Sequence, residues 1–144
     1  MFRSMMVAGA MLLLGVGSVY AATATPLTKD AQIQAGKKIF NANCAACHQP
    51  NGQGMPGMFP PLAKSDYVAK LLKEGNGNLI DVPLKGHNGS LTVNGQDYNG
   101  SMPSMSQLSD QDLANTLTYV VNSWGNPGGQ ISKNDVTKAR AALH

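Results

Sequence analysis

The chain is poor in cysteine, in aromatic residues and in charge, and each shortage narrows what it can be. Only two of the 144 residues are cysteines, so no second cysteine pair is present to complete a zinc tetrahedron. His87 and His144 do not stand at a finger-like spacing that would replace that pair. Charged residues make up 13% of the sequence, and the lysines are not interleaved with aromatics, so nucleic-acid binding is not indicated. Aromatic residues amount to 6%, which leaves a thin core that a buried cofactor would fill.

The two cysteines stand together in the run Cys44-Ala45-Ala46-Cys47-His48. Two thiols three residues apart lie on nearly the same side of a helical turn, so both can reach the vinyl groups along one edge of a porphyrin. The histidine that follows then directs its imidazole at the iron. A redox dithiol would follow a strand in a βαβ unit, and no such pattern surrounds Cys44. The motif therefore predicts one haem c, covalently attached at Cys44 and Cys47, with His48 as an iron ligand.

The first two dozen residues have the pattern of an export signal. Arg3 is their only charge, an apolar stretch covers residues 5–22, and small residues follow. We expect a signal peptide over residues 1–21, with cleavage after Ala21 or Ala24. An uncleaved anchor is the alternative, because the run approaches the ~17 residues that a membrane span needs. Cleavage is favoured because the run ends at an A-x-A-like site, which places the mature protein in the periplasm without a stable membrane anchor.

Residues 22–144 have the size of one domain and contain no internal repeat. Hydrophobic spacing and N-cap residues predict mainly helices. They are expected over residues 29–40, 66–73, 79–85, 110–124 and about 132–143, with caps at Thr28, Ser65, Ser109 and Ser132. The third is the least regular because of Pro83. The last is expected as an appendage packed on the outside. Asn94-Gly95 between short β-prone runs predicts a small hairpin over residues 91–98.

These motifs together resemble the class I c-type cytochromes, which are small mono-haem electron carriers. The similarity covers roughly residues 31–125, from the glycine-and-phenylalanine helix through the C-x-x-C-H run to a methionine-proline pair and a Tyr-Val-x-x-Ser-Trp helix end. The resemblance implies an all-α fold wrapped around one covalent haem, with the hairpin as an excursion before a methionine loop. It also implies that Gly36 and Phe40 meet Tyr119, and that the Pro61 carbonyl accepts a hydrogen bond from His48.

The sixth iron ligand must be chosen among several side chains. Pro103 favours an extended backbone at Met102, and the family's methionine-proline pair matches that position, so Met102 is expected to be the ligand. Met105 is the alternative, with core packing over the haem edge as its other role. Met55 and Met58 are expected to line the pocket. His87 is expected to be a solvated loop residue, and His144 a solvated chain end.

Histidine and methionine together would close both axial positions of the iron. Thioether ligation and burial raise the reduction potential, and little atomic motion accompanies electron transfer. The sequence therefore favours a non-enzymatic one-electron carrier, acting alone as a monomer or as the haem subunit of a larger oxidoreductase. Redox proteins would dock transiently around the haem edge, where Lys64, Lys70, Lys73 and Lys85 are candidates for a basic rim. A five-coordinate haem that binds a small ligand or peroxide is the alternative.

Overall fold

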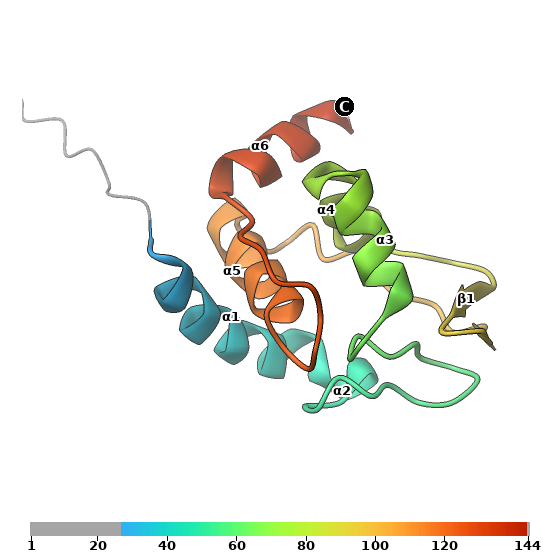
Figure 1. Ribbon diagram of the computed structural model, residues 1–144. Coiled ribbons are helices and arrows are strands. Elements are labelled where there is room, and N and C mark those ends of the chain that lie inside the picture. The colour runs from blue at the N-terminus through green and yellow to red at the C-terminus, as the bar shows by residue number, and fades with distance from the viewer. Residues whose placement is uncertain (1–26, 144) are drawn as a thin grey trace, which may run out of the picture.

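The computed structural model describes residues 27–143, and its architecture is helical with one small hairpin (Figure 1). The predicted signal peptide, both cleavage sites and His144 lie outside the described residues. The elements are α1 (Lys29–Asn43), α2 (Ala45–His48), α3 (Asp66–Glu74), α4 (Asn76–Lys85), β1 (Leu91–Val93), β2 (Gln96–Tyr98), α5 (Asp110–Val121) and α6 (Lys133–Ala142). Among these helices, none combines the length and apolarity that crossing a membrane requires. The all-α prediction with a hairpin excursion is confirmed.

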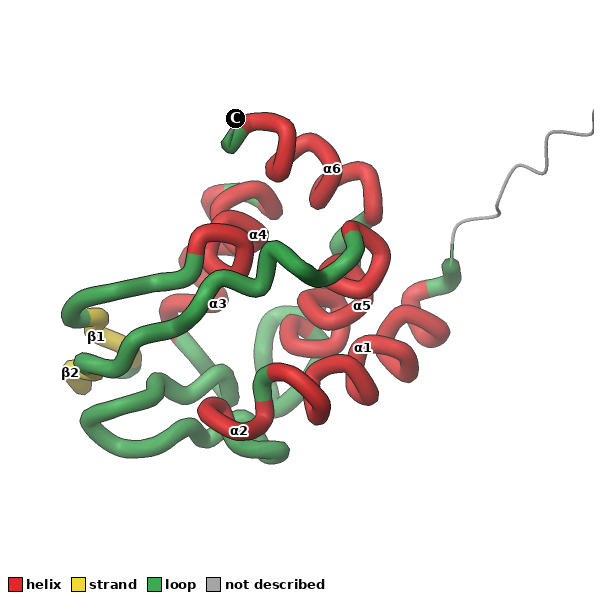
Figure 2. The backbone as a smooth tube through the Cα atoms, turned by 180° about the vertical axis from the view of Figure 1, so that it is seen from behind, coloured by secondary structure: helices red, strands yellow, loops and turns green. Residues whose placement is uncertain are grey.

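Helices α1 and α5 cross closely, and this crossing packs the first helix of the described residues against a helix near their C-terminal end (Figure 2). A Cβ atom on Gly36 would lie 2.5 Å from the Asn115 carbonyl carbon and 2.9 Å from Tyr119 Cβ, so the crossing requires glycine. One turn further on, the Phe40 and Tyr119 rings have centroids 5.5 Å apart. Trp124 packs against both rings at 5.3 Å. The predicted contact of Gly36 and Phe40 with Tyr119 is confirmed.

The predicted N-caps are confirmed, because each of the four side-chain oxygens accepts a hydrogen bond from an amide three residues later. The end of α5 differs from its prediction. The helix stops at Val121, three residues before Trp124, and the Asn122 side chain bonds the carbonyls of Thr118 and Gly129. The Trp124 backbone has a φ of 54°, which lets the indole turn back toward Phe40. Tertiary contacts of one tryptophan therefore override the helical periodicity.

Two further helices depart from their predictions. Helix α4 begins at Asn76, three residues earlier than expected, and it contains Pro83 although proline leaves the Leu79 carbonyl without its helical amide partner. Helix α6 has nearly the predicted bounds but is not an external appendage. Val136 is 0% exposed and belongs to the larger hydrophobic core together with side chains of α3, α4 and α5. Helix α6 is therefore part of the hydrophobic core and not an addition to its outside.

Candidate haem-binding site

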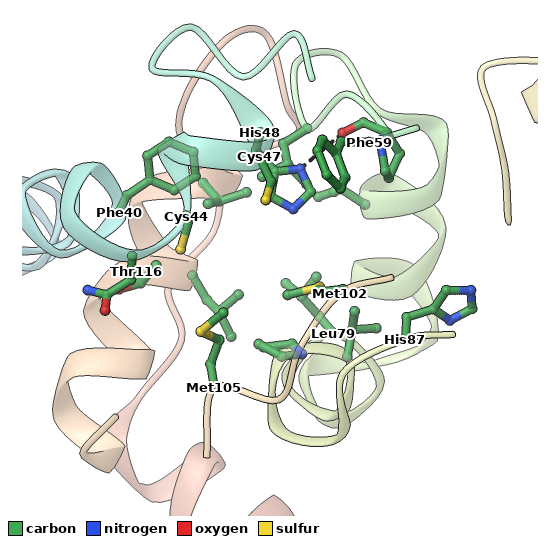
Figure 3. Close-up of a pocket in the computed structure, with 18 of the residues that line it drawn as sticks. Phe40, Cys44, Cys47, His48, Phe59, Leu79, His87, Met102, Met105 and Thr116 are labelled. Atoms are coloured by element: carbon green, nitrogen blue, oxygen red, sulfur yellow. Dashed lines mark hydrogen bonds between the residues drawn. The ribbon is translucent and has the colours of Figure 1, made fainter. Parts of the chain in front are cut away.

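The two cysteines and the histidine lie at the junction of α1 and α2, on one wall of a cavity (Figure 3). Cys44 ends α1, and Cys47 and His48 lie in the single turn of α2. Both cysteines are half-buried and form no disulfide. Burial, with a smaller contribution from Cys47, raises the pKa of the Cys44 thiol to about 11. A redox dithiol requires a lowered thiol pKa, so the environment argues against that function.

The His48 side chain is oriented by a backbone carbonyl on the loop that follows α2. Its Nδ1 lies 3.0 Å from the carbonyl oxygen of Pro60. Burial lowers the pKa of His48, which favours the neutral ring. A neutral ring that donates from Nδ1 leaves the Nε2 lone pair available to a metal.

The prediction that Pro61 accepts this hydrogen bond is wrong, because Pro60 does so. The loop geometry explains the choice. The Gly54 amide donates to the His48 carbonyl, and a Cβ on Gly54 would lie only 2.7 Å from the carbonyl group of Pro60. This close approach holds the Pro60 carbonyl against the histidine. Two adjacent prolines have the same local chemistry, so only the path of the loop distinguishes them.

The opposite wall carries the two methionines of the predicted ligand loop. Figure 3 shows Met102 across the cavity from His48, with Met105 nearer Cys44, and both line the cavity. The Met102 backbone pairs with that of His87 through two hydrogen bonds of 2.8 and 2.9 Å. The His87 ring points away from the gap between His48 and Met102 (Figure 3). His87 is half-buried, and its Nε2 is buried without a hydrogen-bond partner among residues 27–143, so the ring is less solvated than expected.

Met55 and Met58 do not line the cavity, contrary to prediction. Their side chains are 42% and 49% exposed. The amide of Met55 donates to the Phe59 carbonyl at 2.7 Å, and this tight turn directs the Phe59 side chain to the cavity instead. The four lysines proposed as a basic rim are exposed. Lys85 is paired with Asp81 at 2.6 Å, so it contributes little free charge.

Most of the cavity wall comes from residues that the sequence did not single out. Its side chains are largely apolar and come mainly from α3, α4 and α5, including Val68, Leu71, Leu79, Leu113, Leu117 and Val120. The signal for them was the ordinary helical spacing of apolar residues, which also describes a solid core. Here these side chains surround a space that has thiols on one edge and an imidazole and a thioether on opposite walls. Such a wall fits a large planar apolar group with a metal at its centre.

The chain matches the family model described as Cytochrome c over residues 33–124. It is 48% identical over 92 residues to cytochrome c-552 of Thermus thermophilus, covering 62% of this chain and 68% of that protein. It is 34% identical over 121 residues to the cytochrome c subunit of the quinone alcohol dehydrogenase of Gluconobacter oxydans, which covers 82% of this chain but only 24% of that subunit. It is also 31% identical over 100 residues to cytochrome c-554(547) of Halothiobacillus neapolitanus, covering 60% of this chain and 90% of that protein.

The fold, the cavity and these similarities define a mono-haem class I cytochrome. The chain belongs to the cytochrome c family. With its single C-x-x-C-H motif, it carries one covalently attached haem c. Its function is therefore that of an electron carrier.

Proposed function

We propose that the protein transfers single electrons in the periplasm through a haem whose iron is bound by His48 Nε2 and Met102 Sδ. Thioether bonds from Cys44 and Cys47 would attach the haem. The observation that carries this proposal is the placement of the Met102 thioether across the cavity from His48 (Figure 3). His48 and Met102 would together hold the iron, and no coordination site would be left open for a substrate.

The cavity supplies the properties that fast electron exchange needs. When bound, the haem provides the one-electron couple, and the protein sets its potential. The hydrogen bond to Pro60 holds the His48 ring in one orientation, which would limit its movement when the iron gains or loses an electron. Apolar side chains around the site disfavour the additional positive charge of the oxidised state, and a thioether ligand acts in the same direction. Both effects raise the reduction potential.

Two observations support Met102 over Met105 as the ligand. The Met105 sulfur already accepts a hydrogen bond from the Gln107 side-chain amide at 3.5 Å. Within the described residues, the Met102 sulfur accepts no hydrogen bond, so its lone pairs are available to iron. Pro103 also keeps the preceding backbone extended, which presents Met102 from a loop.

The cellular setting is inferred from sequence and from relatives. The apolar N-terminal run with Ala21 or Ala24 as cleavage positions supports export to the periplasm. One relative is the cytochrome c subunit of a quinone alcohol dehydrogenase, which supports a place either as a free carrier or as a haem subunit. The partners would be electron-donor and electron-acceptor proteins, with Lys64, Lys70 and Lys73 as exposed charges that could steer them.

The test is the near-infrared band that arises from a methionine sulfur bound to ferric haem iron. We expect the band in the haem-loaded wild-type protein and in Met105→Leu, and its loss in Met102→Leu. Leucine retains the volume of each side chain and removes only the sulfur. Loss of the band in Met105→Leu alone would transfer the ligand role to Met105. Absence of the band from wild type, with ready carbon monoxide binding to the ferrous form, would instead indicate a five-coordinate haem that binds ligands.

A further inference from the structure

Arg140 of α6 holds the chain segment that follows the two methionines. Its guanidinium donates to the Ser106 carbonyl at 2.9 Å and to the Leu108 carbonyl at 2.8 Å. Its third contact is an ion pair with Asp110 at 2.8 Å, at the start of α5. The Arg140 side chain is 28% exposed, so this pair is partly shielded from solvent. A planar guanidinium can serve three acceptors in fixed directions, which a lysine cannot do.

The opposite side of this segment is bound to the end of α4. The Met105 amide donates to the Pro83 carbonyl at 2.7 Å, and the Ser104 hydroxyl donates to the Leu84 carbonyl at 2.6 Å. Carbonyls in the last turn of a helix have no intrahelical hydrogen-bond partner. The methionine loop supplies the donors for these carbonyls of α4. Ser106 donates its amide to the Ser104 hydroxyl at 3.2 Å, which connects the Arg140 contact with the α4 contact. The loop is therefore held between α4 on one side and Arg140 on the other.

Helix α6 is itself firmly placed, so it can act as a fixed support. Val136 is fully buried in the core, and Asp135 accepts a hydrogen bond from Asn76 at the start of α4 at 3.3 Å. Arg140 also lies beyond residues 33–124, the part of the chain that matches the family model. A residue outside the matched region thus contacts the loop that carries the ligand candidates.

We propose that Arg140 is a positioning residue for the sixth iron ligand. By holding the Ser106 and Leu108 carbonyls, it limits the outward movement that the loop needs for the Met102 thioether to leave the iron. This inference rests on His48/Met102 ligation as proposed above. An added ligand such as imidazole must displace the methionine, so its affinity for the ferric protein measures how firmly the loop is held.

The experiment measures the affinity of imidazole for the haem-loaded ferric protein in wild type and in Arg140→Gln. Loss of the near-infrared sulfur band reports the binding. Loss of one charge-assisted hydrogen bond to the loop corresponds to about tenfold tighter imidazole binding. Arg140→Lys keeps the positive charge near Asp110 but loses the planar guanidinium that donates to both loop carbonyls. It should also tighten imidazole binding, and it replaces the glutamine variant in the experiment if that variant does not fold.

Two controls separate positioning from general stability. Lys138→Gln makes the same charge change on an exposed position of α6, and Val121→Ala weakens core packing at the end of α5, away from α6 and the loop. Both should bind imidazole as wild type does, although Val121→Ala unfolds more easily. Unchanged affinity in Arg140→Gln, or an equal gain in Val121→Ala, would overturn the inference while leaving the ligand assignment intact. Absence of the band in wild type would overturn both.

Discussion

Replacing Gly86 with alanine should weaken the attachment of the methionine loop. Gly86 follows the last residue of α4 and has a φ of 74°, a conformation that L side chains rarely adopt. A Cβ atom at this position would lie 2.5 Å from the Met102 carbonyl oxygen and 2.8 Å from the Ser104 amide nitrogen. Both are backbone atoms, so a change of rotamer cannot relieve the contact. The loop that carries Met102 must move instead.

The expected loss of stability in Gly86→Ala has two parts, and the same substitution at a second glycine separates them. Backbone strain at a positive φ costs about 1–3 kcal/mol for a residue other than glycine. Overpacking adds about 1–3 kcal/mol when the surroundings must shift. Gly89 lies three residues further along with a φ of 105°, but a Cβ there meets open space. Gly89→Ala should therefore show the strain alone, and Gly86→Ala should show both costs.

The assay is guanidinium chloride unfolding of the haem-loaded ferric protein, with the near-infrared sulfur band recorded at each step. We expect Gly86→Ala to be less stable than Gly89→Ala by about 1–3 kcal/mol. Its band should also weaken at lower denaturant concentration, because the contact pushes on Met102 itself. Equal stability of the two variants, with the band intact in both, would refute the idea that the end of α4 and the methionine loop are packed against each other.

Two more predictions concern the helix crossing and the ion pair at α5. Gly36→Ala should lower the free energy of unfolding by about 1–3 kcal/mol because of contact with α5. Gly77→Ala, in a helix with open space around it, should raise the free energy by about 0.4–1 kcal/mol in the same thermal unfolding assay. A hydrogen bond from Thr137, and then contacts from Arg140, lower the pKa of Asp110 in the folded protein. Ionised Asp110 therefore contributes fully to the free energy of unfolding above about pH 4, and this contribution is lost as the pH falls through the lowered pKa. The stability difference between wild type and Asp110→Asn should therefore shrink below about pH 4, and a difference that is constant from pH 7 to pH 2 would contradict this account.

Much of the site could be read from the sequence because its chemistry is local. The thiols of Cys44 and Cys47 and the imidazole of His48 occupy five consecutive residues, so one helical turn brings them to one wall of the cavity. The N-caps are equally local, since each joins a side chain to an amide three residues away. The extended backbone before Pro103 singled out Met102 in the same way. The hairpin at Asn94-Gly95 also depends only on turn chemistry.

Other features were decided only when distant segments met. Pro60, and not Pro61, accepts from His48 because Gly54 lets the loop approach that carbonyl. Helix α5 ends at Val121 because the aromatic contacts of Trp124 and the side-chain bonds of Asn122 outweigh continued helix formation. Met55 and Met58 turn outward for a similar reason, since Phe59 takes the inward position.

Helix α6 shows both kinds of feature, those that are local in the sequence and those that depend on the tertiary structure. The N-cap at Ser132 and the bounds of α6 were predictable from the sequence. The contacts of Arg140 with Ser106, Leu108 and Asp110 join residues at least 30 positions apart, and no sequence period carries that information. The sequence alone therefore determined which cofactor this protein carries and where its thiols lie. The tertiary structure decided which carbonyl orients the histidine and what holds the methionine loop, because those contacts depend on the path of the whole chain.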